Sequence, residues 1–148
     1  MPNKIHLTVA TIVERDGQFL MVKETKFGRQ VINQPAGHVE PGEDIQAAAI
    51  RETFEETGWI VELTGFLGFL TSFNETSGIT YYRLAFAAKP VEFDADARID
   101  PDIDFALWMS YEEIQQNLQQ LRSPGVISCL DDYLAQSIFP MEIFRNTL

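Results

Sequence analysis

The chain has 148 residues, of which 45% are hydrophobic and 11 are phenylalanine, and its formal net charge is −11. This apolar content argues against a disordered chain, and the length fits one domain with a sizeable core, so we expect a single domain over residues 1–148. The negative charge disfavours unaided binding to nucleic acid or to an anionic membrane surface.

Cysteine content and hydropathy bear on the compartment. The one cysteine, Cys129, cannot form an internal disulfide, and its apolar surroundings predict a buried thiol rather than a nucleophile. We find no apolar run of membrane-spanning length and no signal-peptide pattern at the N-terminus. We therefore expect a cytoplasmic protein that does not associate with membranes and that acts as a monomer or a homodimer.

The N-terminal segment predicts a β-hairpin. Residues 5–13 are rich in β-branched side chains, residues 19–22 (FLMV) form a second apolar run, and RDGQ between them is a turn signal. Residues 23–29 (KETKFGR) then predict a polar loop. Its cations are either ordinary surface charges or a rim that faces a phosphate, and Lys23 is the candidate substrate-binding residue among them.

Residues 31–37 (VINQPAG) lead out of this region and predict a close approach of the backbone to a ligand at Gly37. The amide side chains of Asn33 and Gln34 are candidates for reading polar groups of a substrate. His38 is either a neutral loop histidine or a general base.

Residues 43–57 predict a helix of about four turns. Pro41-Gly42 breaks the chain before it, Glu43 and Asp44 are placed in its first turn, and Gly58 supplies the stop. Helical spacing puts Ala47, Ile50 and Phe54 on one face, which we expect to contact the core.

The opposite face of this helix is acidic. Glu52, Glu55 and Glu56 stand at i, i+3 and i+4, where like charges destabilise a helix by ~0.2–0.5 kcal/mol per pair. Arg51 is the one cation nearby. The face is therefore either a solvated surface of an acidic protein or a set of oxygen ligands for a hard divalent cation.

The second half of the chain predicts two more strands, over residues 59–69 and 79–88, on either side of a turn at residues 74–78. Lys89-Pro90 is expected to end the second strand. Arg83 lies within it, where it faces either a phosphate or solvent.

An acidic loop over residues 92–104 and a short strand over residues 105–109 follow. Ser110 begins an S-x-x-E capping pattern for one helix, and Ser123-Pro124 begins a second that runs to about residue 136. The apolar tail, residues 138–148, is expected to dock. This order of elements favours an α/β fold in which a mixed sheet is covered on both faces.

The segment from the loop to the helix end resembles the Nudix family. Its box, G-x5-E-x7-R-E-U-x-E-E-x-G-U with U a bulky aliphatic residue, is matched at Gly37, Glu43, Arg51, Glu52, Glu55, Glu56 and Gly58. Thr53 and Trp59 depart from it, both at packing positions. Outside the box, NQPAGHVE, the DPDID and W-x-S-x-E-E-I stretches and LRSP are similar to the NudJ-type phosphatases of that family.

The resemblance implies an α/β/α sandwich and an enzyme that hydrolyses a diphosphate linked to another moiety. It implies Mg²⁺, or Mn²⁺, held by Glu52, Glu55, Glu56 and the Gly37 carbonyl. Arg51 then orients the glutamates and Glu43 completes that network. The general base is either a box glutamate or an acid of the later loop, where Asp102 is our candidate and Asp100 and Asp104 are its rivals.

For substrates, the likeness to NudJ-type enzymes implies nucleoside tri- and diphosphates, hydroxymethylpyrimidine diphosphate and thiamine diphosphate, with release of orthophosphate. The alternatives are a pyrophosphohydrolase acting on nucleoside triphosphates, ADP-ribose or dinucleoside polyphosphates, and a nucleotide-sensing module without turnover. A third is a purely structural acidic partner protein.

Overall fold

The structure is a computed structural model that describes residues 4–148, and it contains seven strands and three α-helices in that part of the chain. Two short 3-10 segments complete it. The elements are β1 (Ile5–Arg15), β2 (Gln18–Lys26), β3 (Arg29–Asn33), β4 (Ala36–His38), α1 (Ile45–Thr57), β5 (Trp59–Asn74), β6 (Ile79–Phe93), β7 (Ile103–Ser110), α2 (Tyr111–Gln115) and α3 (Pro124–Leu134). No helix in the described part is long and apolar enough to cross a membrane.

The sheet is mixed, as expected. One part has the order β4-β1-β6-β5, in which β1 and β6 are parallel and the other pairs are antiparallel. In the other part β2 pairs antiparallel with both β3 and β7. The two parts meet at the β1–β2 hairpin, whose turn residues Asp16 and Gly17 both have positive φ, as a two-residue hairpin turn requires.

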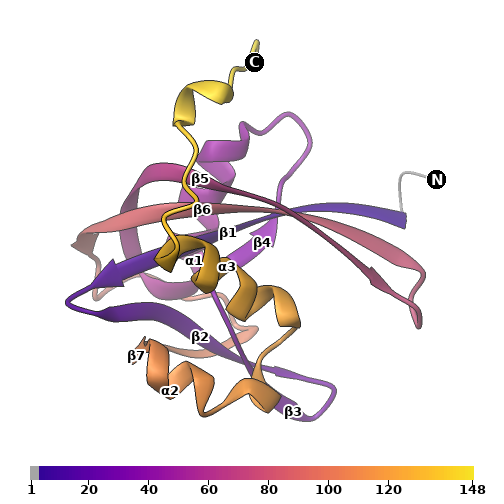
Figure 1. Cartoon of the computed structure of the whole chain (residues 1–148), viewed down its shortest axis with the longest axis vertical. Helices are drawn as coiled ribbons and strands as arrows, with labels where there is room; N and C mark the ends of the chain where they lie inside the picture. The colour runs from indigo at the N-terminus through magenta and orange to yellow at the C-terminus, as the bar shows by residue number, and fades with distance from the viewer. Residues whose placement is uncertain (1–3) are drawn as a thin grey trace.

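Helices α1 and α3 cover opposite faces of the β1–β6–β5 part (Figure 1). Alternate residues of a strand point to opposite faces. On β6, Leu84 and Phe86 pack with Ala48 and Ala49 of α1. The intervening residues, Ala85 and Ala87, belong to the cluster that contains α3. This arrangement confirms the α/β sandwich predicted from the order of elements.

The C-terminal tail docks on the face of the sheet that α1 covers. Phe139 exchanges two backbone hydrogen bonds with Phe66 of β5, at 2.9 and 2.7 Å. The ring of Phe144 then packs edge-on against Phe66 and at a tilt against Phe86. The apolar tail therefore closes the core, as its composition predicted.

The prediction of a polar loop over residues 23–29 was wrong. Strand β2 continues to Lys26, a two-residue turn at Phe27 and Gly28 follows, and β3 begins at Arg29. The strand was hidden because the inward-facing position after Val22 is a glutamate, Glu24, which is only 6% exposed. Lys89-Pro90 likewise does not end β6, which continues to Phe93 past an irregularity opposite Val61.

Helix α1 begins at Ile45, two residues later than the acids suggested. Asp44 is its N-cap and accepts a hydrogen bond from the Ala47 N–H at 3.0 Å, so neither Glu43 nor Asp44 lies in the first turn. Gly58 ends the helix in the left-handed conformation with φ 78°, as predicted. Ser110 also begins α2 with the predicted capping box.

The core-facing side of α1 was predicted correctly at Ile50, which packs against a core cluster, but not at its most buried positions. Ala48, Ala49 and Thr53 are buried, whereas Ala47 is exposed and Ile50 and Phe54 are only partly buried. Thr53 replaces the usual aliphatic residue of the box and is fully buried. Its hydroxyl donates to the Ala49 carbonyl at 2.7 Å, and it therefore accepts from the Thr11 hydroxyl of β1, which is also 2.7 Å away. The two hydroxyls satisfy each other inside the core.

The hydrogen bond between Thr11 and Thr53 can be tested by substitution. Thr53→Val keeps the shape of the side chain but leaves the Thr11 hydroxyl buried without this partner, so we expect a loss of ~1–3 kcal/mol in the free energy of unfolding. Urea denaturation measures it. The double variant Thr11→Val/Thr53→Val removes both hydroxyls, and it should lose less than the sum of the two single variants. Strict additivity would contradict the pairing.

Candidate functional site

A cleft of about 1020 Å³ lies beside the acidic face of α1. Box residues form one part of its wall: Gly37, His38, Glu40, Glu52 and Glu56. The β5–β6 hairpin, the end of β3, the acidic loop and the first turn of α3 supply the rest. The stretch that carries the box therefore opens onto this cleft.

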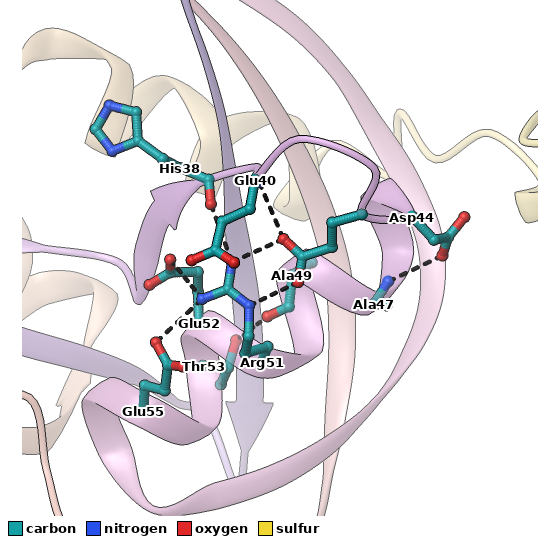
Figure 2. Close-up of polar contacts among 10 residues, drawn as sticks. His38, Glu40, Asp44, Ala47, Ala49, Arg51, Glu52, Thr53 and Glu55 are labelled. Atoms are coloured by element: carbon teal, nitrogen blue, oxygen red, sulfur yellow. Dashed lines mark hydrogen bonds and ion pairs between the residues drawn. The ribbon is translucent and has the colours of Figure 1, made fainter. Parts of the chain in front are cut away.

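Arg51 joins the box together (Figure 2). Its guanidinium donates to both carboxylate oxygens of Glu43, at 2.6 and 2.8 Å, and to Glu52 and Glu55 at 2.9 and 3.1 Å. Its Nη2 also donates to the backbone carbonyl of His38 at 3.0 Å. One side chain thus ties the helix to the loop before it and to the end of β4, as the sequence predicted for an orienting arginine.

The bond to Arg51 sets the charge state of Glu43. Hydrogen bonding from the guanidinium lowers the pKa of Glu43, and the Glu43 carboxylate in turn raises the pKa of Arg51. Glu43 also accepts from the Glu40 N–H at 3.1 Å. The Glu43 carboxylate does not line the cleft, and it contacts the cleft wall through its hydrogen bonds to Arg51.

Glu56 is the carboxylate with the least compensation. It is 7% exposed and its one hydrogen-bond donor is the Ala36 N–H, at 2.9 Å. Burial raises the pKa of Glu56 to about 8, and the negative charges of Glu24, Glu52 and Asp100 add to the effect against the Ala36 bond. A carboxyl group kept this far from water and this close to other acids is stabilised as an anion by a cation.

Glu52 shares this environment. Burial raises the pKa of Glu52 although Arg51 opposes the shift, and Glu55 and Asp100 add to it. Its carboxyl group lies directly against Gly37, where a Cβ atom would overlap all three carboxyl atoms. Only glycine at this position leaves room for Glu52 in the cleft.

These residues fit a hard divalent cation. The buried donors are carboxylate oxygens, the ligands that Mg²⁺ and Mn²⁺ favour, and they carry more negative charge than nearby cations balance. Within residues 4–148 no three acidic, histidine or cysteine side chains already stand in a ligating arrangement, since Arg51 holds Glu52 and Glu55. Arg51 bonds one carboxylate oxygen of each of these two glutamates, Oε1 of Glu52 and Oε2 of Glu55, and does not bond the other.

The acidic loop brings two of its three candidate acids to the cleft. Asp100 and Asp102 line it, whereas Asp104 lies outside the lining and is bonded to Thr25 and Gln30 on the neighbouring strands. The Asp100 N–H donates to the Glu55 carbonyl at 2.9 Å, which anchors the loop to the end of α1. The Asp102 N–H donates to the Asp100 carboxylate at 2.8 Å.

Two of the four predicted substrate-binding residues line the cleft and two do not. Asn33 and Arg83 line the cleft. Gln34 is fully buried, with its amide between Arg83 and the Val126 carbonyl, and it is absent from the lining. Lys23 is also absent from it, because its ammonium lies over the Phe105 ring at 5.7 Å. The structure therefore gives Gln34 and Lys23 no contact with the cleft.

His38 lies at the end of β4, beside the box. Its Nε2 is 2.9 Å from Nδ1 of His6, and burial together with the charge of His6 lowers the pKa of His38. The ring is therefore favoured in its neutral form, as expected for a histidine without a carboxylate partner.

The pairing of Glu24 with Arg122 in the cleft escaped the sequence analysis. Glu24 is buried on β2 and is paired with Arg122 at 3.0 Å, across 98 positions of sequence. Phe73, 61% exposed at the tip of β5, and Tyr81 bring aromatic rings to the rim. A glutamate in an otherwise apolar, alternating strand was the available signal for Glu24, whereas nothing local pointed to its pairing with Arg122.

Comparison with known proteins decides the family. The model of the NUDIX domain matches residues 4–128. The chain belongs to the Nudix family.

Relatives agree along nearly the whole chain. Phosphatase NudJ of Escherichia coli strain K12 is 36% identical over 143 residues, which cover 97% of this chain and 92% of the relative. A solved NUDIX hydrolase from Nitrosomonas europaea is 37% identical, with a TM-score of 0.93 and 97% of each chain covered. A Caenorhabditis elegans Ap4A hydrolase complex, 21% identical with a TM-score of 0.69, covers 88% of this chain and 96% of its own, and shares the fold.

The expectations of a Nudix fold and of a hydrolase are therefore confirmed. Enzymes of this family generally use divalent metal ions, which agrees with the uncompensated carboxylates of the cleft. The residue roles carried over from the box, including that of the Gly37 carbonyl, stay predictions at this point.

Gly37 offers a direct test of the box geometry. Gly37→Ala places a methyl group where the Glu52 carboxyl group lies, so we expect turnover to fall by about 10²-fold because a catalytic group is displaced. Steady-state kinetics measure the loss. Gly17→Ala is the control: its added Cβ meets nothing within 4 Å, although its φ of +80° makes it cost some stability. Wild-type turnover in Gly37→Ala would refute the proposed crowding.

Proposed function

We propose that the protein is a Mg²⁺-dependent phosphatase in the cytoplasm that acts on nucleoside tri- and diphosphates, hydroxymethylpyrimidine diphosphate and thiamine diphosphate and releases orthophosphate. Mn²⁺ is the alternative ion. The observation that carries the proposal is the buried carboxyl group of Glu56 on the cleft wall, which within residues 4–148 forms no ion pair and is surrounded by the acids Glu24, Glu52 and Asp100. The similarity to the E. coli phosphatase NudJ supports this branch of the family.

The box supplies the acidic end of the site. Glu52, Glu55, Glu56 and the Gly37 carbonyl would hold the ion, which neutralises the phosphates, lowers the pKa of a bound water and stabilises the leaving group. Arg51 would keep its two hydrogen bonds to Glu43 while Glu52 and Glu55 bind the ion. Arg51 therefore orients the helix and the preceding loop whether or not the glutamates bind an ion.

Asp102 is our candidate for the group that accepts the proton of the attacking water. It lines the cleft on a loop that is anchored to α1 through Asp100, so its position relative to the glutamates is defined. Its rival Asp104 lies outside the lining and is held by Thr25 and Gln30.

The first test is a phosphate-release panel with Mg²⁺ on the wild type and on Glu56→Gln. The substrates are those proposed above together with ADP-ribose and a dinucleoside polyphosphate, with products separated by chromatography. We expect turnover to require the ion and to fall by about 10³-fold or more in Glu56→Gln, because a ligand charge is lost.

Each product pattern has a distinct meaning. Orthophosphate from the diphosphates supports the proposal, whereas pyrophosphate would show a pyrophosphohydrolase. Nucleotide binding without turnover would show a sensing module. Full activity in Glu56→Gln would exclude the acidic face as the catalytic centre. Absence of both turnover and nucleotide binding in the wild type and in Glu56→Gln would favour the structural alternative.

A matched pair of isosteric variants tests the base. Asp102→Asn should lower kcat by about 10²–10⁴-fold, the range of general-base catalysis, with little change in KM. Asp104→Asn should leave kcat near the wild-type value because Asp104 does not line the cleft. Equal kcat values for the two variants would return the role of base to a box glutamate.

A further inference from the structure

The cleft contains an arginine, Arg83, that forms no ion pair with a carboxylate of residues 4–148, although the charges of Glu24 and Glu56 act on it from farther away. Nη2 of Arg83 donates to the neutral amide oxygens of Gln34, at 2.5 Å, and Asn33, at 3.3 Å. Its Nε is buried and has no hydrogen-bond partner within residues 4–148. Most of the side chain is removed from water, and burial lowers the pKa of Arg83. What remains accessible lines the cleft.

Such an arrangement is costly in a protein without a ligand for it. A buried charge without a counter-ion destabilises a fold. With a net charge of −11, this protein has more than enough carboxylates to supply a counter-ion for Arg83. Arg122 shows the contrast, because on the same cleft it is paired with Glu24. Amides orient a guanidinium without neutralising it, and so they leave its charge available to an anion.

Gln34 ties this arginine to a second electropositive group. Its Oε1 accepts from Arg83, and its Nε2 donates to the Val126 carbonyl in the first turn of α3, at 2.6 Å. Pro124 and Gly125 of that turn line the cleft together with Ser123. The Ser123 side chain does not cap the helix, so the partial positive charge of this N-terminus is left for another acceptor.

We propose that Arg83 and the N-terminus of α3 form a phosphate-binding subsite, held in place by Gln34 and separate from the carboxylates of α1. The subsite rests on the proposed function, since it binds a phosphate group of the same substrate. The substrate then spans the cleft with one phosphate near the glutamates and an anionic group at Arg83. Gln34 is a positioning residue, which explains why it is fully buried.

Calorimetric titration of the metal-free protein with orthophosphate tests the subsite without turnover. Arg83→Gln should weaken phosphate binding by about 10-fold or more, and Arg83→Lys by less, because an ammonium retains the charge but not the fork. With Mg²⁺ and substrate, Arg83→Lys should raise KM more than it lowers kcat. Unchanged phosphate affinity in Arg83→Gln, or no phosphate binding by the wild type, would overturn the proposal.

A second variant keeps the test valid if Arg83→Gln does not fold. Asn33→Asp is isosteric and gives Arg83 a carboxylate partner, so we expect weaker phosphate binding by about 10-fold together with an unchanged or raised Tm. Asn74→Asp is the control, because it adds the same charge to the cleft lining away from Arg83 and retains the acceptor for the Ser77 N–H. An equal loss of phosphate affinity in both variants would show that the added negative charge simply repels phosphate, and it would overturn the subsite.

Glu56→Gln separates this proposal from the proposed function. It should lose turnover yet bind orthophosphate at least as tightly as the wild type, because it removes a negative charge from the cleft. Loss of turnover there, with phosphate affinity unchanged in the Arg83 variants, overturns the subsite alone. Retained turnover in Glu56→Gln overturns the proposed function, whatever the titrations show.

Discussion

The ion-pair network of Arg51 is the interaction on which the acidic end of the cleft depends. Helix α1 presents acids at spacings that repel one another, and the guanidinium fork offsets this by bonding Glu43 twice and two further glutamates once each. Its bond to the His38 carbonyl also fixes the end of β4, which carries Gly37. The same arginine thus supports the fold of the loop and the position of the ligating side chains.

The hydrogen-bond network of Arg51 does not include Glu56. Arg51 compensates Glu43 and reaches Glu52 and Glu55, but Glu56 lies beyond it in a buried position with one backbone donor. At Arg83 the imbalance is reversed, since a buried cation has only amide acceptors. In the proposed function these two ends of the cleft bind a metal ion and a phosphate group of one substrate, and each end would be stabilised by that ligand.

The sequence predicted the centre of the site well because the box residues are local to one loop and one helix. Its register correctly placed Gly58 as the helix stop and Arg51 within reach of the glutamates. The errors have physical causes. Glu24 concealed a strand because its counter-ion comes from residue 122, and Ala47 was placed in the core because Thr53 was not recognised as a buried polar partner of Thr11. Gln34 was read as a ligand contact because its acceptor group and its donor group meet partners that are 49 and 92 positions away.

Distant contacts also show where specificity can reside in a fold that carries a common box. The segment before α3 is attached to β3 by the backbone, through the Arg122 N–H and the Ile32 carbonyl at 2.8 Å, and by the Gln34 side chain to Val126. The C-terminal part of the chain therefore forms a wall of the cleft rather than an appendage. Substitutions there change which groups meet the distal end of a substrate while leaving the glutamates and Arg51 untouched. In the proposed function the box positions the reaction and the wall near α3 contacts what extends from it, so that a shared box can serve different diphosphates.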